Sequence, residues 1–282
     1  MPSYPYRIVN VFTLPDAALS GNPLCVFENG VGLDTPHMQA FARQFNLSET
    51  TFILPSERAT ARVRIFTPTY EMPFAGHPTL GTAHVCRAMG LAGDAISLEM
   101  QAGVIPVRAS GRRFTLQANP PRWREVTEPR AALAGMLGVG ADEIGDRPLW
   151  VNAGREQLIV PLQSEAAVRR ALPSATALRQ FASEEGASMV YVFALAGTGH
   201  SVRARFFFPS GPAVLEDPAT GSATANLGGW LIALGNPLPR RIDITQGVET
   251  GRPSALHLEV DAERRIFVSG DVIELGRGTI AL

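Results

Sequence analysis

The chain has 282 residues, 45% of them hydrophobic and 18% charged, with a formal net charge of −1, which is the composition of a globular protein of about two domains. The near-zero net charge provides no basic field for nucleic acid or for an anionic membrane surface. No apolar run approaches the ~20 residues of a membrane-spanning helix, and the N-terminus lacks a signal-peptide pattern, so we expect a cytoplasmic protein.

Missing residue types exclude several kinds of chemistry. All 25 basic residues are Arg, so the chain has neither a Walker A lysine nor a Schiff-base lysine. Cys25 and Cys86 are the only cysteines and have no CxxC partner, so we expect buried free thiols. His77 and His84 lack metal-ligand spacing, and the chain has no glycine-rich nucleotide motif. We therefore predict no metal site and no nucleotide site.

The first half of the chain shows a strand-rich pattern with two helices. The expected elements, in order, are strands over 5–13 and 22–28, a helix over 35–46, a strand after Glu49, a strand over 62–68, a helix from the corner at 76–78 to Gly90, and short strands over 95–118. Glu49 lies at a helix-to-strand junction, where an acid without a partner is ordinarily solvated. His77 lies between Gly76 and Pro78, which is too constrained for an ordinary surface histidine. A hydrogen-bonded structural role and a functional role are equally open for it.

The second half begins with a Pro- and charge-rich run over 120–130, which is the best candidate for a linker. The expected elements then are a helix over 130–137, a strand over 157–162, a helix over 175–182, strands over 189–195 and 202–209, a helix from Gly221 to Gly235, and strands and turns after 238.

The two halves also share an internal repeat. RVRIFTP at 62–68 and RARFFFP at 203–209 have Arg, Arg, Phe and Pro at the same positions. Each run leads to a corner glycine, Gly76 or Gly221, and then to a helix of apolar and small residues. Such a helix is apolar around most of its circumference and should be buried on all sides. We therefore predict a duplicated unit in which strands surround one buried helix.

The second corner, EDPATGSATANLGGWL, has the features of an anion-binding site. A helix that begins at Gly221 and Ser222 presents free N–H groups and the positive end of its dipole. Ser222 is expected to be the N-cap, while Asp217 is open to a capping or a functional role. Glu71 and Glu216, which precede the two corners, are expected to be solvated. Ser222, His77 and Asp217 could be combined into a hydrolase triad, but TGSAT is not a G-x-S-x-G elbow.

Three motifs in order, NLSETTFI, EMPFAGHPTLGTAHV and EDPATGSATANLGGWL, resemble the PhzF-like family of phenazine-biosynthesis isomerases, which belongs with diaminopimelate epimerase-like proteins. The resemblance covers nearly the whole chain. It implies an α+β fold of two similar domains, each a barrel-like, mostly antiparallel sheet around a central helix. We expect the first domain over 1–125, joined by the C-terminal strand at about 270–282, and the second over 126–269. The resemblance also implies a homodimer and no cofactor.

The resemblance assigns roles to the candidate residues. It implies that Glu49, His77 and Asp217 are catalytic, with Glu49 as the acid/base group. It implies that the substrate carboxylate is held at the corner positions Gly76, Gly221 and Ser222. The expected reaction is a proton shift on a small carboxylic acid such as trans-2,3-dihydro-3-hydroxyanthranilate.

Two other functions stay open for the sequence. Related epimerases use a pair of thiols at the two corners, but this chain has Ala75 and Thr220 there, which disfavours two-thiol racemisation. A small-acid binding protein on the same fold is the alternative from another class, because fold does not determine function. The presence of Glu49, His77 and Asp217 together favours an enzyme.

Overall fold

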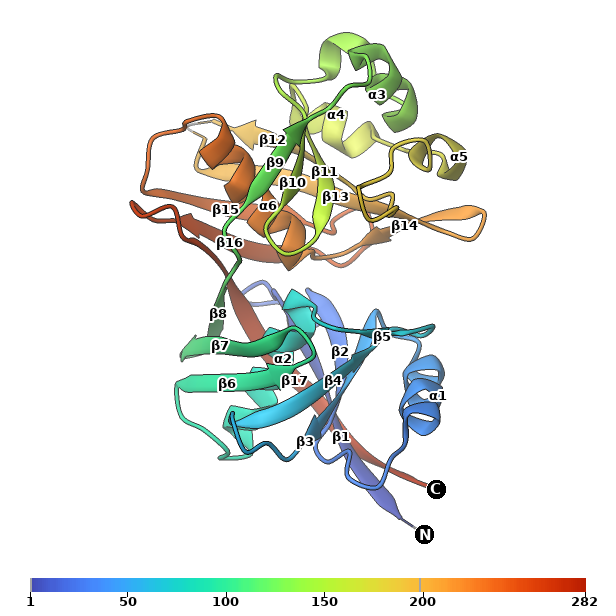
Figure 1. Ribbon diagram of the computed structural model, residues 1–282, viewed down its shortest axis with the longest axis vertical. Coiled ribbons are helices and arrows are strands. Elements are labelled where there is room, and N and C mark those ends of the chain that lie inside the picture. The colour runs from blue at the N-terminus through green and yellow to red at the C-terminus, as the bar shows by residue number, and fades with distance from the viewer. Residues whose placement is uncertain (1, 198) are drawn as a thin grey trace. The chain divides into compact units, whose positions relative to one another are not determined.

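The computed structural model describes residues 2–197 and 199–282, and the chain divides into two compact units. Unit 1 comprises Met1–Gln117 and Ser269–Leu282, and unit 2 comprises Ala118–Val268. The sequence predicts the division after residue 125. Residues 118–125 group with unit 2 because a strand within this segment pairs with the next strand of that unit (Figure 1).

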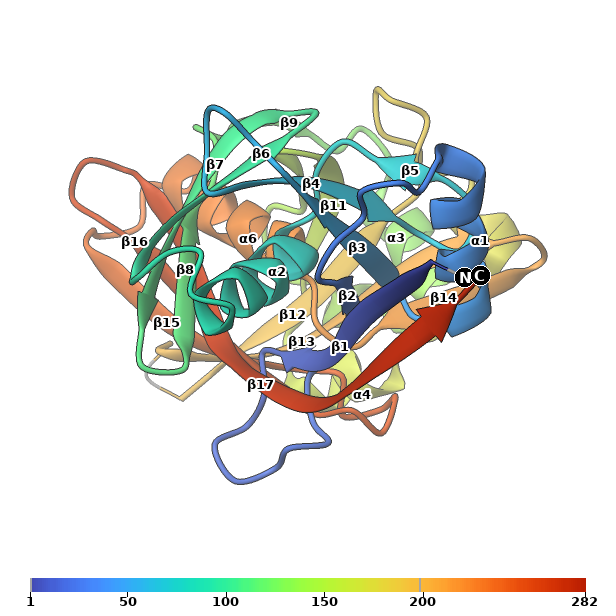
Figure 2. The same ribbon diagram turned by 90° about the horizontal axis from the view of Figure 1, so that it is seen from below.

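Unit 1 is a closed barrel around one helix. Its elements are β1 (Ser3–Val11), β2 (Asn22–Phe27), α1 (Thr35–Phe45), β3 (Glu49–Leu54), β4 (Ala61–Phe66), β5 (Glu71–Met72), α2 (Gly76–Ala88), β6 (Ala95–Met100), β7 (Gly103–Ser110), β8 (Arg113–Gln117) and β17 (Ile266–Ala281). Pairing runs in the order β1-β2-β3-β4-β6-β7-β8-β17 and returns to β1. Figure 2 looks along this barrel, with α2 inside the ring of strands.

The helix α2 is buried because small residues let the barrel wall approach it closely. A Cβ added at Gly81 would lie 2.5 Å from Leu24 Cδ2 and 3.0 Å from Val11 Cγ2. On the outer face of the barrel, α1 covers an aromatic cluster in which Phe27 stacks on Phe41 and on Phe52. The barrel is therefore packed on both of its faces, as a sheet with two apolar faces requires.

Unit 2 repeats this arrangement. Its elements are β9 (Arg122–Glu125), α3 (Arg130–Leu137), a 3-10 turn (Ala141–Glu143), β10 (Leu149–Asn152), β11 (Glu156–Pro161), α4 (Glu165–Arg170), α5 (Ala175–Leu178), β12 (Val190–Ala196), β13 (Ser201–Ser210), β14 (Ala213–Asp217), α6 (Gly221–Ala233), β15 (Arg240–Gln246) and β16 (Ser254–Val260). The strands pair in the order β9-β10-β11-β12-β13-β15-β16, with β14 on β13. In α6, every residue from Gly221 to Ile232 except Ser222 is buried. The helices α3, α4 and α5 enclose a second core on the other face of the sheet (Figure 1).

The duplication extends to strand direction and helix ends. In unit 1, β2-β3 and β4-β6 are parallel pairs, and in unit 2 β11-β12 and β13-β15 are the parallel pairs at the same places in the order. Both central helices end at a left-handed glycine, Gly90 with φ +76° and Gly235 with φ +69°. The amide after each glycine bonds back to a helix carbonyl, Leu91 to Cys86 and Asn236 to Leu231, which is the Schellman pattern. The predicted α+β fold of strands around a central helix is confirmed.

Some predicted elements differ from the structure. The linker expected over 120–130 contains β9, a strand that pairs with β10. The helix expected over 175–182 is only the short α5, and α4 and β14 were not predicted. These elements are short, so tertiary pairing rather than local pattern decides them. None of the helices within 2–197 and 199–282 has the combined length and apolar character that a membrane crossing needs.

Candidate active site

In unit 1, the structure brings Glu49 and His77 together. Glu49 is the first residue of β3 and pairs in parallel register with Leu24 of β2. His77 is the second residue of α2, which begins after Ala75 in an extended conformation. Pro78 fits this first turn because it has no N–H to leave unpaired. The corner thus holds His77 rigidly, with its side chain only 5% exposed and 3.0 Å from the carboxylate of Glu49.

The contacts of the imidazole indicate where its proton lies. His77 Nδ1 is 3.0 Å from Glu49 Oε2, and His77 Nε2 is 3.3 Å from the carbonyl oxygen of Pro23. A carbonyl can only accept, so the tautomer is assigned with the proton on Nε2. Nδ1 then faces the carboxylate either as an acceptor or, in the imidazolium, as a second donor. The pair can therefore hold one transferable proton between Nδ1 and Oε2.

Glu49 Oε2 is buried and has no well-directed hydrogen bond within 2–197 and 199–282. Its distance to His77 is that of an ion pair, but the direction of approach falls short of a hydrogen bond. A buried carboxylate oxygen without a directed donor is costly and is unusual away from functional sites. Chemically, such an oxygen is able to accept a proton from a neighbouring group.

The other predicted residues form a polar corner in unit 2. Asp217 ends β14, and its Oδ2 accepts a hydrogen bond from the Thr220 hydroxyl at 2.5 Å. The buried side chain of Gln246 donates to the Asp217 carbonyl at 2.8 Å and to Thr220 Oγ1 at 2.9 Å. The N-cap of α6 is Thr220. The prediction of Ser222 as the N-cap is wrong, because the helix begins two residues earlier.

Ser222 belongs to a separate hydrogen-bonded network in the first turn of α6. Its hydroxyl accepts from Gln157 Nε2 at 3.0 Å, and Gln157 Oε1 accepts from Asn226 Nδ2 at 2.8 Å. Asn226 Oδ1 accepts from the amide of Ala153 at 2.7 Å. Because Gln157 is the donor in this bond, the hydroxyl proton of Ser222 is available to another acceptor.

The two helix starts differ in the amides that they provide. The first bonds within the helices run from the Thr79 amide to the Ala75 carbonyl and from the Thr224 amide to the Thr220 carbonyl. The amides before these have no acceptor inside their helix. In α2 this group is shortened by Pro78, whereas α6 has an N–H at each of the residues 221–223. The start of α6 thus has more amides that could bind an anion than the start of α2.

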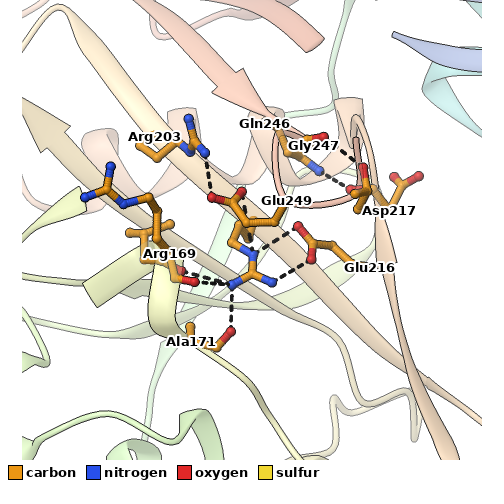
Figure 3. Close-up of polar contacts among 11 residues, drawn as sticks. Arg169, Ala171, Arg203, Glu216, Asp217, Gln246, Gly247 and Glu249 are labelled. Atoms are coloured by element: carbon orange, nitrogen blue, oxygen red, sulfur yellow. Dashed lines mark hydrogen bonds and ion pairs between the residues drawn. The ribbon is translucent and has the colours of Figure 1, made fainter. Parts of the chain in front are cut away.

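The prediction that Glu71 and Glu216 are solvated is wrong. Glu71 accepts two hydrogen bonds from Arg64, at 2.7 and 2.6 Å, and Glu216 accepts two from Arg205, at 3.0 and 2.7 Å. Figure 3 shows Glu216 and its neighbour Glu249 within this polar cluster, beside Asp217 and Gln246. Both acids are paired because each lies on a short strand whose neighbour carries the arginine.

Both cysteines are buried free thiols, as predicted. Burial raises the pKa of Cys86 to about 12, and it raises the pKa of Cys25 further. Neither is therefore a thiolate base near neutral pH. Outside residues 1 and 198, no group of three or more His, Cys, Asp and Glu side chains is arranged to hold a metal ion.

Three buried amides contribute to this part of unit 2 without having been predicted from the sequence. Gln157, Asn226 and Gln246 are at most 1% exposed, and each makes hydrogen bonds at the start of α6 or at the corner before it. Asn226 could have been found, since it is the one amide side chain in a helix of otherwise small and apolar residues. Gln157 and Gln246 lie in strands with ordinary alternation and carry no comparable signal.

Comparison with known proteins places the chain in a family. A family model described as phenazine biosynthesis-like protein (PhzC-PhzF) matches residues 9–276. An uncharacterised isomerase from Pasteurella multocida is 37% identical over 98% of this chain and 94% of its own length. A trans-2,3-dihydro-3-hydroxyanthranilate isomerase from Pseudomonas chlororaphis is 36% identical over 98% of this chain and 99% of its own length.

A solved structure supports the same assignment at the level of the fold. The phenazine biosynthesis protein of the PhzF family from Bacillus anthracis superposes with a TM-score of 0.87, with 22% identity and 100% of both chains covered. The relatives named as isomerases confirm the predicted enzyme class. The chain belongs to the phenazine biosynthesis-like (PhzF) family of isomerases.

Proposed function

We propose that this isomerase moves a proton on a small carboxylic acid, with Glu49 as the acid/base group and without a cofactor. The proposed substrate class is a cyclic unsaturated acid of the kind named for the Pseudomonas chlororaphis relative, trans-2,3-dihydro-3-hydroxyanthranilate. The observation that carries the proposal is the buried Oε2 of Glu49, which has an imidazole nitrogen at 3.0 Å and no well-directed hydrogen bond in the described part of the chain.

The charges assign different tasks to the two corners. A substrate carboxylate is repelled by an ionised Glu49 and attracted by the positive end of a helix dipole. The amides of Gly221 and Ser222 and the Ser222 hydroxyl are therefore the proposed carboxylate site of unit 2, and the amide of Gly76 is the corresponding candidate in unit 1. The neutral amide of Gln157 orients the hydroxyl without adding a competing charge.

The proposed reaction balances with a proton alone. Glu49 removes a hydrogen from an allylic carbon, the electron pair of that C–H bond shifts along the π system, and a proton is returned to the carbon at its other end. Substrate and product have the same formula, so no oxidant or reductant is consumed. His77 shares the proton with Glu49 between these steps, and Asp217 orients the substrate. A positioned acid/base group of this kind contributes roughly 10²–10⁴-fold.

Two-thiol epimerisation is the rival chemistry on this fold. It needs thiols at the two corners, where this chain has Ala75 and Thr220. Cys86 lies ten residues into α2 rather than at its start and is protonated at neutral pH, since burial raises its pKa to about 12. The thiols therefore do not support an epimerase mechanism.

A solvent-exchange experiment tests the proposal. The protein is incubated with trans-2,3-dihydro-3-hydroxyanthranilate in D₂O, and the reaction is followed by proton NMR. We expect conversion to an isomer that carries deuterium at the carbon to which the proton is returned. Glu49→Gln should lower kcat by roughly 10²–10⁴-fold.

The matched control is Glu57→Gln, because Glu57 is an exposed acid of the same unit, and this variant should keep wild-type kcat. Full activity of Glu49→Gln would assign the base to another residue. Tight binding of the acid with neither turnover nor exchange would identify a binding protein instead.

Three further expectations belong to the proposal. We propose a cytoplasmic homodimer that has no nucleic-acid or membrane partner. The near-neutral charge of the chain supports the absence of a nucleic-acid partner. Analytical ultracentrifugation at micromolar concentration tests the dimer, and a single species of 30.2 kDa would contradict it.

A further inference from the structure

Arg205 of β13 is a buried guanidinium with every donor group engaged. Its Nε and Nη2 atoms donate to the carboxylate of Glu216 at 3.0 and 2.7 Å, a bidentate pair. Its Nη1 donates to the carbonyls of Val168, Arg169 and Ala171 at 3.3, 2.9 and 2.7 Å. The side chain of Arg205 is 7% exposed and that of Glu216 is 12% exposed. Figure 3 shows these contacts around Glu216, Arg169 and Ala171.

This pair lies directly beside the predicted catalytic corner. Glu216 and Asp217 are consecutive, and they pair with Phe207 and Phe206 of β13. Asp217 is the last residue of β14, so its backbone direction is set by the residues before it. Arginine with five donors in a rigid fork determines the orientation of a carboxylate more closely than a point charge does. Fixing Glu216 therefore fixes the strand end that presents Asp217.

A second ion pair holds the loop that packs on the same corner. Arg203 Nη2 donates to Glu249 Oε1 at 2.6 Å, and Arg205 Nε is 3.9 Å from Glu249 Oε2. The loop before Glu249 touches the corner closely, since a Cβ added at Gly247 would lie 2.4 Å from the Pro218 carbonyl. Pro218 follows Asp217 directly. The two arginines of β13 thus bind both the end of β14, through Glu216, and the loop after β15, through Glu249.

Unit 1 contains an equivalent arginine–glutamate pair before its central helix. Arg64 forms a bidentate pair with Glu71, which is paired with Phe66 as Glu216 is paired with Phe207. Each guanidinium also lies over the aromatic ring two residues later, Arg64 at 5.0 Å from Phe66 and Arg205 at 4.6 Å from Phe207. In each unit the acid is on the short strand that leads to the corner of the central helix. Burying an ion pair gives little net stability compared with apolar residues, so stability alone does not explain its presence at both corners.

We propose that Arg205 is a positioning residue, which through Glu216 holds Asp217 and the start of α6 in the geometry that the reaction needs. This inference rests on the proposed function of the corner. Arg205 is 7% exposed and its guanidinium bonds to Glu216 and to backbone carbonyls, so the proposed effect acts through Glu216. Because misplacing a catalytic group by about 1 Å can lower a rate by 10²-fold, loosening this pair should affect turnover beyond any effect on folding.

The test compares Arg205→Lys and Glu216→Gln with Arg265→Lys as the matched control. Arg265 pairs with Asp261 at the surface of the same unit, with its side chain 55% exposed. With trans-2,3-dihydro-3-hydroxyanthranilate as substrate, kcat per folded molecule should fall at least tenfold in Arg205→Lys and Glu216→Gln, with a smaller change in KM. The double variant should be no worse than the poorer single variant, because both remove one interaction. Arg265→Lys should stay within twofold of wild type.

Folded fractions are measured by urea unfolding, so that a loss of folding is not counted as a loss of turnover. In Glu216→Gln, Arg205 keeps its carbonyl acceptors. This variant therefore tests the proposal even if Arg205→Lys does not fold. Wild-type kcat per folded molecule in Glu216→Gln would overturn the positioning role.

Hydrogen exchange provides a readout that needs no turnover. In Glu216→Gln, the amides of Asp217 and of residues 219–223 should exchange faster, while those of β12 should be unchanged. If the wild type converts none of the acid, the proposed reaction fails, and unchanged exchange at Asp217 and 219–223 would separately overturn the anchoring by Arg205.

Discussion

His77 Nδ1 lies 3.0 Å from Glu49 Oε2 in unit 1, and the equivalent positions of unit 2 carry neither an acid nor an imidazole. The strand register places Met189 of unit 2 at the position equivalent to Glu49, because Thr50 pairs with Phe66 as Val190 pairs with Phe207. Since Gly76 and Gly221 correspond in the repeat, Ser222 is at the position equivalent to His77. The duplication therefore preserved the scaffold while the two corners acquired different chemistry.

Combined substitution of the pair tests whether Glu49 and His77 act as one unit. We expect Glu49→Gln and His77→Gln each to lower kcat by roughly 10²–10⁴-fold, as loss of an acid/base group does. If the two groups hold one shared proton, the double variant should be close to the poorer single variant rather than the product of both effects. The measurement is kcat and KM for all four proteins at one pH. Multiplicative losses would show that the two residues act in independent steps.

A charge change at Gln157 tests the carboxylate site in unit 2. Gln157→Glu keeps the shape but places a negative charge 3.0 Å from Ser222 Oγ. That charge should repel a substrate carboxylate, so we expect KM to rise tenfold or more, with less effect on kcat. Ser222→Ala should raise KM less, by the loss of one hydrogen bond worth about 0.5–1.5 kcal/mol.

The control for this comparison is Gln163→Glu, since Gln163 is an exposed glutamine in the same unit. An unchanged KM in Gln157→Glu, with both variants folded, would remove the start of α6 from substrate binding.

The sequence was sufficient for features that depend on local pattern. The repeat of RVRIFTP, the corner glycines and the apolar helices predicted the two central helices, because periodicity and glycine conformation are local properties. The sequence was not sufficient for pairing across strands. Glu71 and Glu216 look like solvated acids, and their arginine partners become neighbours only when β5 lies on β4 and β14 lies on β13. For the same reason Ser222 was taken for a cap, although its partner is Gln157 of a distant strand.

His84 should make the stability of the protein depend on pH. It lies on α2 against the ring of Phe114, and burial lowers its pKa below the ordinary value of 6.5, with Arg7 and Arg87 acting in the same direction and Glu274 opposing them. As the pH falls below 6.5, the unfolded chain therefore takes up a proton at His84 before the folded protein does. The stabilisation is present above this pH and is lost as the pH falls through the lowered pKa.

Urea unfolding at pH 7.5 and pH 5.5 measures this effect. The free energy of unfolding should fall more between these pH values in the wild type than in His84→Gln, which cannot take up the proton. An equal fall in both proteins would assign the acid sensitivity to other groups.

Gly81 tests how closely the barrel wall packs on the central helix. An added Cβ would lie 2.5 Å from Leu24 Cδ2 and 3.0 Å from Val11 Cγ2, so Gly81→Ala forces side chains or the helix to move. Overpacking of this kind costs about 1–3 kcal/mol, which exceeds the ~1 kcal/mol that alanine gains over glycine in a helix. We expect a net loss in the free energy of unfolding, together with a lower kcat, because α2 carries His77.

Gly93→Ala is the matched control, since an added Cβ there meets nothing within 4 Å, and its effect on the free energy of unfolding should stay within about 0.5 kcal/mol. Urea unfolding at 25 °C measures both variants. If Gly81→Ala is as stable as Gly93→Ala, the side chains of Leu24 and Val11 move aside at no measurable cost in stability.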